Sequence, residues 1–446
     1  MTEQRAEQLR IAGVVLGGLA IVFVYAFPGY MAYDSLDQLR QARAGVMTDW
    51  HPPVMSALWG VLDKIVSGPL LMLVLQCSLF LAGLYVLLRR RMPPRRAIVL
   101  TLVIFAMPPV LTMMAVILKD CLMAGALLVG CAALTSERRG ARFAALGVFL
   151  FAAALRHNAI SMVVPLVAIL SPWPSTKGPW IKLAVGALIG IALSGTAMLV
   201  NKGLTDVESH PFHGMVAPMD IVGTLNYAPD LTDDEVRKLM PGVTFAPASG
   251  LQVHARKVHT MYGLPMSHTH GPDRLYDGGT TAETRDAVGS AWWSLVTTFP
   301  ASYLIFRLEM MRELLGITNA RYTPVYEARN ERAMLTANGE PLMDRNVVQR
   351  WLAKRMINLG YRSLLFRPYV YLILALGLLW ILRRDRSVLA LLLSGLSGLA
   401  LCLIVIPAPD IRYCWWLMVV TLYAVAIRLA GTKPSDLGTA AAPVDA

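Results

Sequence analysis

Tyr33-Asp34-Ser35-Leu36-Asp37 and Asp49-Trp50-His51-Pro52-Pro53 belong to one short polar stretch between two hydrophobic segments, 11–27 and 69–88. Ionisable residues next to membrane spans are costly, and they mark functional sites when they gather in one place. This stretch carries several carboxylates, an imidazole, a tryptophan and a Pro-Pro pair. We therefore interpret residues 28–68 as the loop that forms the floor of a functional site.

The composition predicts an all-α, polytopic membrane protein. Hydrophobic residues make up 56% of the chain, the mean hydropathy is +0.52, and several apolar runs approach the length that crosses a bilayer core of roughly 30 Å. The net charge of +12 is scattered among these runs and does not form one face, so we predict no nucleic-acid partner. The five cysteines lie within or beside apolar runs and show no disulfide or zinc spacing.

The basic loops predict the orientation. Arg89 to Arg96 is the most basic short loop, and Arg138 to Arg142 and Arg383 to Arg386 are further basic turns; such loops face the cytoplasm. The first apolar run has no small-residue cleavage site after it and is interpreted as a retained span. About ten helices then cross the membrane, with both termini in the cytoplasm. The predicted spans are 11–27, 69–88, 97–118, 121–134, 143–155, 159–170, 183–200, 367–382, 387–406 and 413–430.

Four regions follow from this map. They are an N-terminal transmembrane module (1–200) that contains the catalytic first outer loop (28–68), an external domain of helical and irregular structure (201–365), C-terminal transmembrane helices (366–432) and a disordered cytoplasmic tail (433–446). In the external domain, Thr232 and Glu235 form a capping box that predicts a helix start. The segment 292–316 is apolar but interrupted by Pro300 and charges, which favours an interfacial helix.

Local patterns predict the shape of the first outer loop. Leu36, Leu39, Ala42 and Val46 recur at helical spacing while Gln38 and Gln41 point elsewhere, which is typical of an amphipathic surface helix. After Pro53, a second stripe of Val54, Leu58, Val61 and Ile65 predicts another helix. Farther on, Met107-Pro108-Pro109 should break the third span, because proline removes a backbone donor.

The map brings polar residues from several loops to the outer face, where all eight histidines also fall. Carboxylates together with Arg and Lys suit a reaction in which a nucleophile loses a proton and an anion departs. Phosphate fits as that anion, since guanidinium binds it through two hydrogen bonds. The residues are Asp34, Asp37, Asp49 and His51 from the first loop, Lys119 and Asp120 from the second, Arg156, His157 and Asn158 from the third, and Asp410, Arg412 and Tyr413 from the last.

This order of motifs resembles the GT-C glycosyltransferases, integral membrane enzymes that use polyprenyl-phosphate sugars. The resemblance implies a bacterial inner-membrane enzyme with its site on the periplasmic face, a polyprenyl-phosphate-linked sugar as donor, a glycan, lipid or protein as acceptor, and contact with membrane lipids. It implies that Asp34 is the catalytic base or helps to hold a metal, with Asp120 as the second acid. The full set is catalytic Asp34, Asp49, His51 and Asp120; phosphate-binding Lys119, Arg156, Arg412 and Tyr413; and pocket-lining Tyr33, Asp37, Trp50, His157, Asn158 and Asp410.

The metal is left unknown. The family's Asp-x-Asp is absent, because Asp34-Ser35-Leu36-Asp37 has one residue too many. A divalent metal stays open as the single cofactor, with Asp34, Asp49 and His51 as its ligands. The pairs His210/His213 and His268/His270 also have ligand-like spacing, although histidines in polar loops are more often solvated.

Several positions keep a structural alternative. Ser35 with Gln38 matches a capping box, so Asp34 or Ser35 would only cap a helix. Asp49 to Pro52 would be a cap with an interfacial tryptophan, and Lys119-Asp120 and Asp410-x-Arg412 would be ion pairs at helix ends.

Two other function classes remain open. A transporter or flippase for a lipid-linked sugar or solute needs interrupted helices in matching halves, and Pro108-Pro109 has no counterpart in the second half. A non-catalytic polysaccharide assembly factor would not need so many ionisable groups near the membrane.

Overall fold

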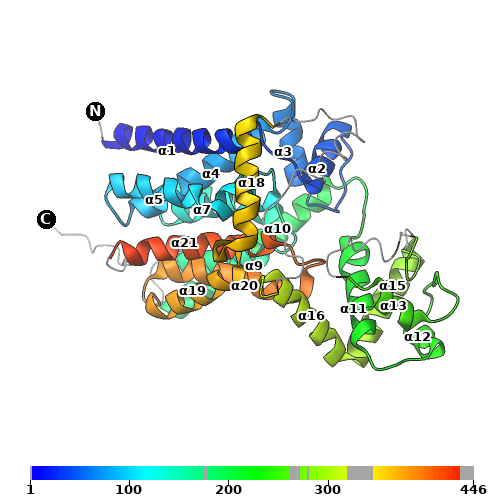
Figure 1. Cartoon of the computed structure of the whole chain (residues 1–446). Helices are drawn as coiled ribbons and strands as arrows, with labels where there is room; N and C mark the ends of the chain where they lie inside the picture. Colours follow the sequence, from blue (N-terminus) through cyan, green and yellow to red (C-terminus); the bar gives the residue numbers. More distant parts are fainter. Residues whose placement is uncertain are drawn as a thin grey trace. The chain divides into compact units, whose positions relative to one another are not determined.

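The computed structural model describes residues 3–173, 178–260, 269, 272–278, 281–318 and 345–431, and these ranges fold into helices joined by short turns (Figure 1). The predicted tail, 433–446, lies outside the described residues. The chain divides into two compact units, and each is described by itself. The first unit draws on 1–207, 323–399 and 414–446, and the second on 208–322 and 400–413.

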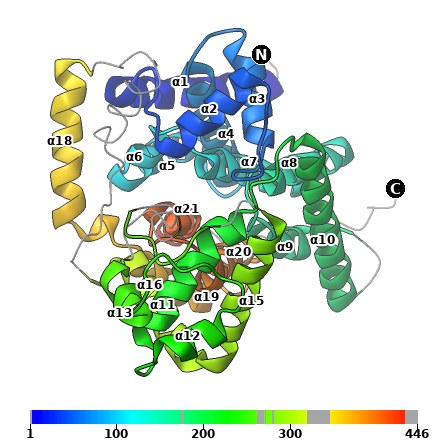
Figure 2. The same cartoon turned by 90° about the vertical axis from the view of Figure 1, so that its right-hand side faces the viewer.

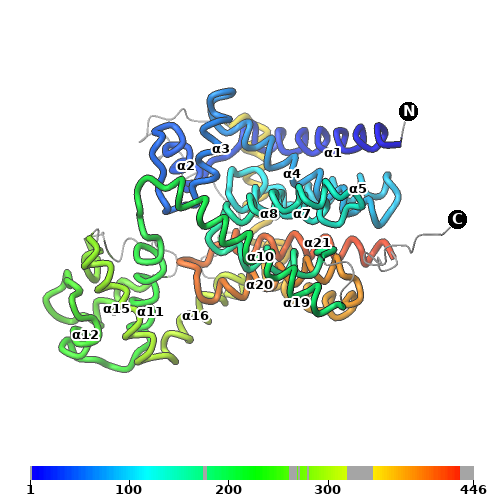
Figure 3. The backbone as a smooth tube through the Cα atoms, turned by 180° about the vertical axis from the view of Figure 1, so that it is seen from behind, coloured from blue at the N-terminus to red at the C-terminus, as the bar shows by residue number. Residues whose placement is uncertain are grey.

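The first unit is a bundle of helices, several of which run side by side in nearly one direction (Figure 3). Its elements are α1 (Glu3–Ala26), α2 (Tyr33–Ala44), α3 (Val54–Asp63), α4 (Leu70–Arg89), α5 (Pro94–Ala106), α6 (Pro108–Met114), α7 (Lys119–Leu134), α8 (Arg139–Ala154), α9 (Ile160–Leu170), α10 (Pro179–Leu204), α18 (Val347–Arg362), η2 (Leu364–Phe366), α19 (Pro368–Ile381) and α21 (Trp415–Leu429). Two further elements, α20 (Arg386–Val405) and η3 (Ile411–Cys414), continue from one unit into the other.

The chain is a helical membrane protein. By length and apolar composition, five helices in the described ranges are able to cross a bilayer, or six when the bent pair of α5 and α6 is counted as one span. The bend between them is 73°, and it confirms the break predicted at Pro108. Ten spans stay a prediction. The five helices are Glu3–Ala26, Leu70–Arg89, Pro179–Leu204, Arg386–Val405 and Ile411–Leu429.

The centre of the first unit is α7, which is buried along almost its whole length and packs on α4 and α8. Glycines let α4 and α7 approach closely: a Cβ on Gly83 would lie 2.7 Å from the backbone nitrogen of Val129, and one on Gly125 would lie 3.0 Å from that of Phe80. Small residues serve this purpose between membrane helices. The close packing fixes the start of α7, which carries Lys119 and Asp120.

The irregular segment Ala115–Leu118 joins α6 to α7 and is anchored by hydrogen bonds. Tyr30 donates its N–H to Ala115 O (2.9 Å) and accepts from Ile117 N (2.9 Å). Gln76, buried in α4, donates to Met114 O (2.8 Å) and Val116 O (2.9 Å). A buried backbone carbonyl must find a donor, and the Gln76 amide supplies one for two carbonyls.

The structure confirms two helices in the loop 28–68 but corrects their faces. On α2, Leu36 and Leu39 are buried as predicted; Gln38 and Gln41 are buried too, and Val46 lies beyond the helix and is exposed. The helix ends because Gly45 adopts the left-handed conformation (φ 66°). On α3, the buried residues are Met55, Ser56 and Trp59, whereas the predicted stripe member Val61 is exposed, and Ile65, also exposed, lies beyond the end of the helix. In a membrane protein an apolar stripe also suits a lipid-facing surface.

The capping alternatives for this loop have different outcomes: Ser35 takes part in a capping box with Ala32 at the start of α2, whereas no side-chain cap is found at the start of α3. Ser35 lies at the third position of α2, where its hydroxyl accepts from Ala32 N (2.9 Å) and donates to Ile117 O (2.5 Å). Pro53 is the N-cap of α3 and makes no side-chain capping bond, so Asp49 caps nothing there.

The second unit is built around α11, which packs against α13, α15 and α16. Its apolar core includes Ile221, Leu225, Leu251 and Leu295. The predicted capping box is confirmed: Thr232 accepts from Glu235 N, and Glu235 accepts from Thr232 N. The elements are η1 (Phe212–Val216), α11 (Ala217–Tyr227), α12 (Asp233–Leu239), α13 (Leu251–Val258), α15 (Ala282–Thr298) and α16 (Pro300–Leu314).

Two predicted boundaries differ in the structure. The segment 292–316 is not one helix, because α15 ends at Thr298 and Pro300 starts α16, as expected for a residue without an N–H. Helix α18 was assigned to the external domain, yet it groups with the first unit, where it contacts α1 and α6. Figure 2 shows α18 as a peripheral helix of that unit.

Candidate functional site

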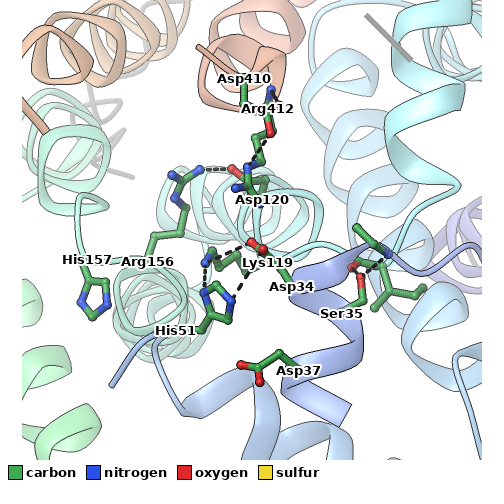
Figure 4. A network of polar contacts seen from close by, with 12 residues as sticks. Asp34, Ser35, Asp37, His51, Lys119, Asp120, Arg156, His157, Asp410 and Arg412 are labelled. Carbon is green, nitrogen blue, oxygen red and sulfur yellow. Dashed lines mark hydrogen bonds and ion pairs between the residues drawn. The ribbon is translucent and has the colours of Figure 1, made fainter. Parts of the chain in front are cut away.

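Three predicted residues from distant parts of the first unit meet at one point (Figure 4). Asp34 lies in the first turn of α2, His51 precedes α3, and Lys119 begins α7. Asp34 Oδ1 is 3.7 Å from His51 Nε2, and Asp34 Oδ2 is 3.7 Å from Lys119 Nζ. Lys119 Nζ is also 2.7 Å from His51 Nδ1. A carboxylate, an imidazole and an ammonium thus form a triangle.

The ammonium determines the tautomer of the imidazole. A lysine ammonium has only donors, so Lys119 Nζ donates and His51 Nδ1 accepts. In neutral His51 the proton therefore sits on Nε2, the nitrogen that faces Asp34. His51 is buried, whereas 15% of the Asp34 side chain is exposed. The Lys119 side chain is 12% exposed, so an external molecule can reach both the carboxylate and the ammonium.

A second ion pair supports the triangle from within. Arg156 donates to Asp120 Oδ1, and both side chains are buried. Asp120 follows Lys119 in the first turn of α7, while Arg156 follows the end of α8. A buried pair of this kind holds its two elements in register, because separating it would leave a charge without compensation. The alternative predicted an ion pair between Lys119 and Asp120. In the structure Lys119 contacts Asp34 and His51, and Asp120 pairs with Arg156.

The loop before His51 is tied down by polar side chains. Gln41 donates to Thr48 Oγ1 (3.2 Å) and its Oε1 accepts from Thr48 N (3.1 Å). Asp206, just after α10, accepts from Met47 N (2.8 Å). Asp49 contributes through its backbone: its carbonyl lies 3.2 Å from His157 Nε2. Asp49 and His157 therefore join the first loop to the turn after α8.

The other predicted residues of the first unit surround this point more loosely. Asp37, one turn after Asp34, accepts from Gln41 Nε2 (2.7 Å), and burial raises the pKa of its carboxyl. Tyr33 is half exposed at the start of α2, and Trp50 is partly buried. The backbone carbonyl of Asn158 accepts a hydrogen bond from the Ser161 hydroxyl (2.9 Å). This bond shapes the turn before α9.

The last three predicted residues belong to the second unit and form a cluster of their own. Arg412 Nε lies 3.1 Å from Asp410 Oδ2, and Asp410 Oδ1 accepts from Arg412 N (3.1 Å). The guanidinium of Arg412 also lies over the Tyr413 ring, 5.3 Å from its centre. This confirms the alternative in which Asp410 and Arg412 form a local ion pair.

Sequence reasoning missed the residues that hold the site together. Gln76 and Gln41 fix the segments that carry Lys119 and His51, and Ser35 links α2 to Ile117. The available signal was Gln76, the single amide in the apolar helix α4, since polar residues inside membrane segments mark special roles. The second unit holds another missed pair: Arg307 Nη2 donates to Asp220 Oδ2 (2.7 Å).

The proposed metal ligands fit a divalent cation poorly. Lys119 Nζ lies within 3.7 Å of both Asp34 and His51, so an ammonium already stands where the cation would bind, and like charges repel. The Asp49 contact is made by its carbonyl. Among the described residues, no group of three or more His, Cys, Asp or Glu is arranged to hold a metal ion. His210 pairs with Glu208, while His268 and His270 lie outside the described ranges.

Comparisons of the chain with protein-family models, with curated proteins and with solved structures found no match.

Proposed function

We propose that this protein is a membrane glycosyltransferase of the GT-C type, which transfers a sugar from a polyprenyl-phosphate donor to a glycan, lipid or protein acceptor on the outer face of the bacterial inner membrane. One observation carries the proposal: Asp34, His51 and Lys119 converge from three segments, with the imidazole buried and with 15% of the Asp34 side chain and 12% of the Lys119 side chain exposed. A base beside a cation suits proton removal coupled to departure of an anion.

In this mechanism Asp34 accepts the proton of the acceptor hydroxyl. The oxygen then forms a bond to the anomeric carbon while the bond from that carbon to the donor phosphate oxygen breaks, and polyprenyl phosphate leaves with the electron pair. Lys119, whose side chain is 12% exposed, stabilises the negative charge that grows on the phosphate. Arg156, engaged with Asp120, positions Lys119 and does not itself bind the phosphate.

The proposal includes an orientation: about ten spans, both termini in the cytoplasm and the site outside. The five native cysteines are all buried, so introduced cysteines can be labelled against a low background. A cysteine at Gly250 should react with an impermeant thiol reagent in intact cells, and one at Pro94 should not. Reaction at Pro94 without lysis would reverse the orientation.

The alternative of transport rests on the bend of 73° between α5 and α6, since broken helices line the substrate path of many transporters. The bend also has a local purpose, because it leads into the Ala115–Leu118 segment that positions Lys119. A transfer assay separates the two functions.

For that assay the purified protein is placed in liposomes with radiolabelled polyprenyl-phosphate hexoses or pentoses and an envelope extract as acceptor. We expect label in the acceptor and an equal amount of free polyprenyl phosphate. Intact donor that crosses the bilayer without cleavage would indicate a flippase. If neither transfer nor crossing were seen, the result would indicate an assembly factor. Transfer should persist with EDTA; complete loss that one divalent ion restores would show that a metal takes part.

A further inference from the structure

A cavity of about 290 Å³ lies in the first unit between the end of α1 and the start of α18. Aromatic side chains from the α1 end form one side: Phe23 and Phe27 meet edge to face, with ring centres 5.4 Å apart, and Tyr30 lies beyond them. Arg345 and Asn346 form the other side. The volume approaches the lower end of ligand pockets, roughly 300 Å³.

The charged residue among the described lining residues of this cavity is positive. The Arg345 guanidinium lies 4.4 Å from the centre of the Tyr30 ring, and its buried Nε makes no hydrogen bond. None of the described residues that line the cavity is acidic. The first turn of α18 opens beside Arg345 and adds the partial positive charge of a helix N-terminus. A cation next to aromatic rings, with no carboxylate among the described lining residues, suits an anion that carries an apolar part.

The position of α18 forms one wall of the cavity and indicates the level at which the cavity lies in the membrane. Gln349 Nε2 donates to Phe27 O (3.2 Å), which fastens α18 to the end of α1. Helix α18 crosses the direction of α1 near that end (Figures 1 and 2), where a span leaves the bilayer core. Its outer surface exposes Val347, Val348 and Trp351 (56% exposed), with Arg355 over the tryptophan ring. Tryptophan beside basic residues is typical of the lipid headgroup level.

We propose that this cavity binds the headgroup phosphate of an anionic phospholipid from the surrounding bilayer. Arg345 donates to the phosphate, the rings of Phe23 and Phe27 contact the glycerol and the first methylenes, and the chains continue over the exposed apolar face of α18. An ammonium in the headgroup would find no ion-pair partner here, because the described lining has no carboxylate. The site is separate from the Asp34 triangle and does not depend on the transfer reaction.

The test is lipid binding by the purified, full-length protein in detergent, followed by native mass spectrometry. Phosphatidylglycerol should bind more tightly than phosphatidylcholine with the same chains, and diacylglycerol, which lacks the phosphate, should bind weakly. Inorganic phosphate at millimolar concentration should not displace the lipid. Arg345→Gln should weaken phosphatidylglycerol binding about tenfold, the scale of one charged hydrogen bond.

The matched control is Lys354→Gln, which removes a positive charge from an exposed position on the same helix away from the cavity; it should bind as the unaltered protein does. Phe27→Ala, at a half-exposed ring, gives a second variant and should also weaken binding. Equal loss in Lys354→Gln, normal binding by Arg345→Gln, or displacement by inorganic phosphate would each overturn the proposal.

Discussion

The two units each contain a carboxylate that faces a cation and a nitrogen-bearing ring, but the two carboxylates differ in burial and in the contacts they make. In the second unit Asp220 accepts from Arg307 (2.7 Å) and from Trp292 Nε1 (2.8 Å), and Arg307 also donates to Ile406 O (2.8 Å). Asp220 and Arg307 are 0% and 1% exposed. In the first unit the Asp34 carboxylate is partly exposed, and its oxygens lie 3.7 Å from His51 Nε2 and from Lys119 Nζ.

This difference separates a structural pair from a reactive one. Short hydrogen bonds and full burial make the Asp220 pair costly to break and closed to any substrate. Partial exposure gives an external hydroxyl access to the Asp34 carboxylate, as proton transfer requires. The residue types alone do not distinguish the two clusters, so the comparison has to be tested with substitutions in both.

The largest effect is expected from Asp34→Asn. The amide keeps the shape of the side chain and removes its basicity, so transfer should fall by a factor of about 10²–10⁴, the usual contribution of a general base, with little change in thermal unfolding. The control Asp63→Asn removes an exposed ion pair with Arg43 (2.9 Å) and should leave transfer intact. Near-normal transfer by Asp34→Asn would make Asp34 a structural residue like Asp220.

The second effect concerns the buried pair. Arg307→Met leaves Asp220 buried without its cation and should lower the free energy of unfolding by about 3–5 kcal/mol. Adding Asp220→Leu removes the stranded carboxylate and should recover part of that loss. Thermal unfolding of the full-length protein in detergent measures both variants. If the single variant were as stable as the unaltered protein, the pair would not hold the second unit together.

The sequence predicted those features of the fold and the site that depend on residues close together in the chain. Apolar runs predicted the helix at 69–88, which the structure places at Leu70–Arg89, and Pro108 predicted the break after α5. Those features depend on neighbouring residues. The Asp120–Arg156 contact joins residues 36 positions apart, and Arg307–Asp220 joins residues 87 apart. No periodicity encodes such pairings. The loop order grouped Asp34 with Lys119 on one face but did not reveal that His51 stands between them.

A third, smaller effect tests the support of the first cluster. Gln76→Leu leaves the Val116 carbonyl without its amide donor and the Met114 carbonyl with only the weak Cys77 Sγ donor (3.8 Å). This should cost about 1–3 kcal/mol and slow transfer, because the segment that carries Lys119 loosens. Gln38 is the matched control: it is equally buried, yet its amide makes no hydrogen bond, so Gln38→Leu should not destabilise the protein. Equal destabilisation by both changes would show that the bonds of Gln76 are not what matters.

The smallest effect is a pH dependence in the second unit. His259 lies between the rings of Tyr227 (6.0 Å) and Phe306 (5.7 Å), and burial lowers its pKa. Below about pH 6.5, the ordinary imidazole pKa, the unfolded chain binds a proton that folded His259 accepts only at lower pH. Stability is therefore complete above that pH and falls as the pH decreases through this window. The unfolding temperature of His259→Gln should decrease less between pH 7.5 and 5.5 than that of the unaltered protein. An identical decrease in both proteins would remove His259 from the acid response. The substitution should leave the pH profile of transfer unchanged, because His259 belongs to the second unit and the Asp34 triangle to the first. That result would separate titration in the second unit from catalysis in the first.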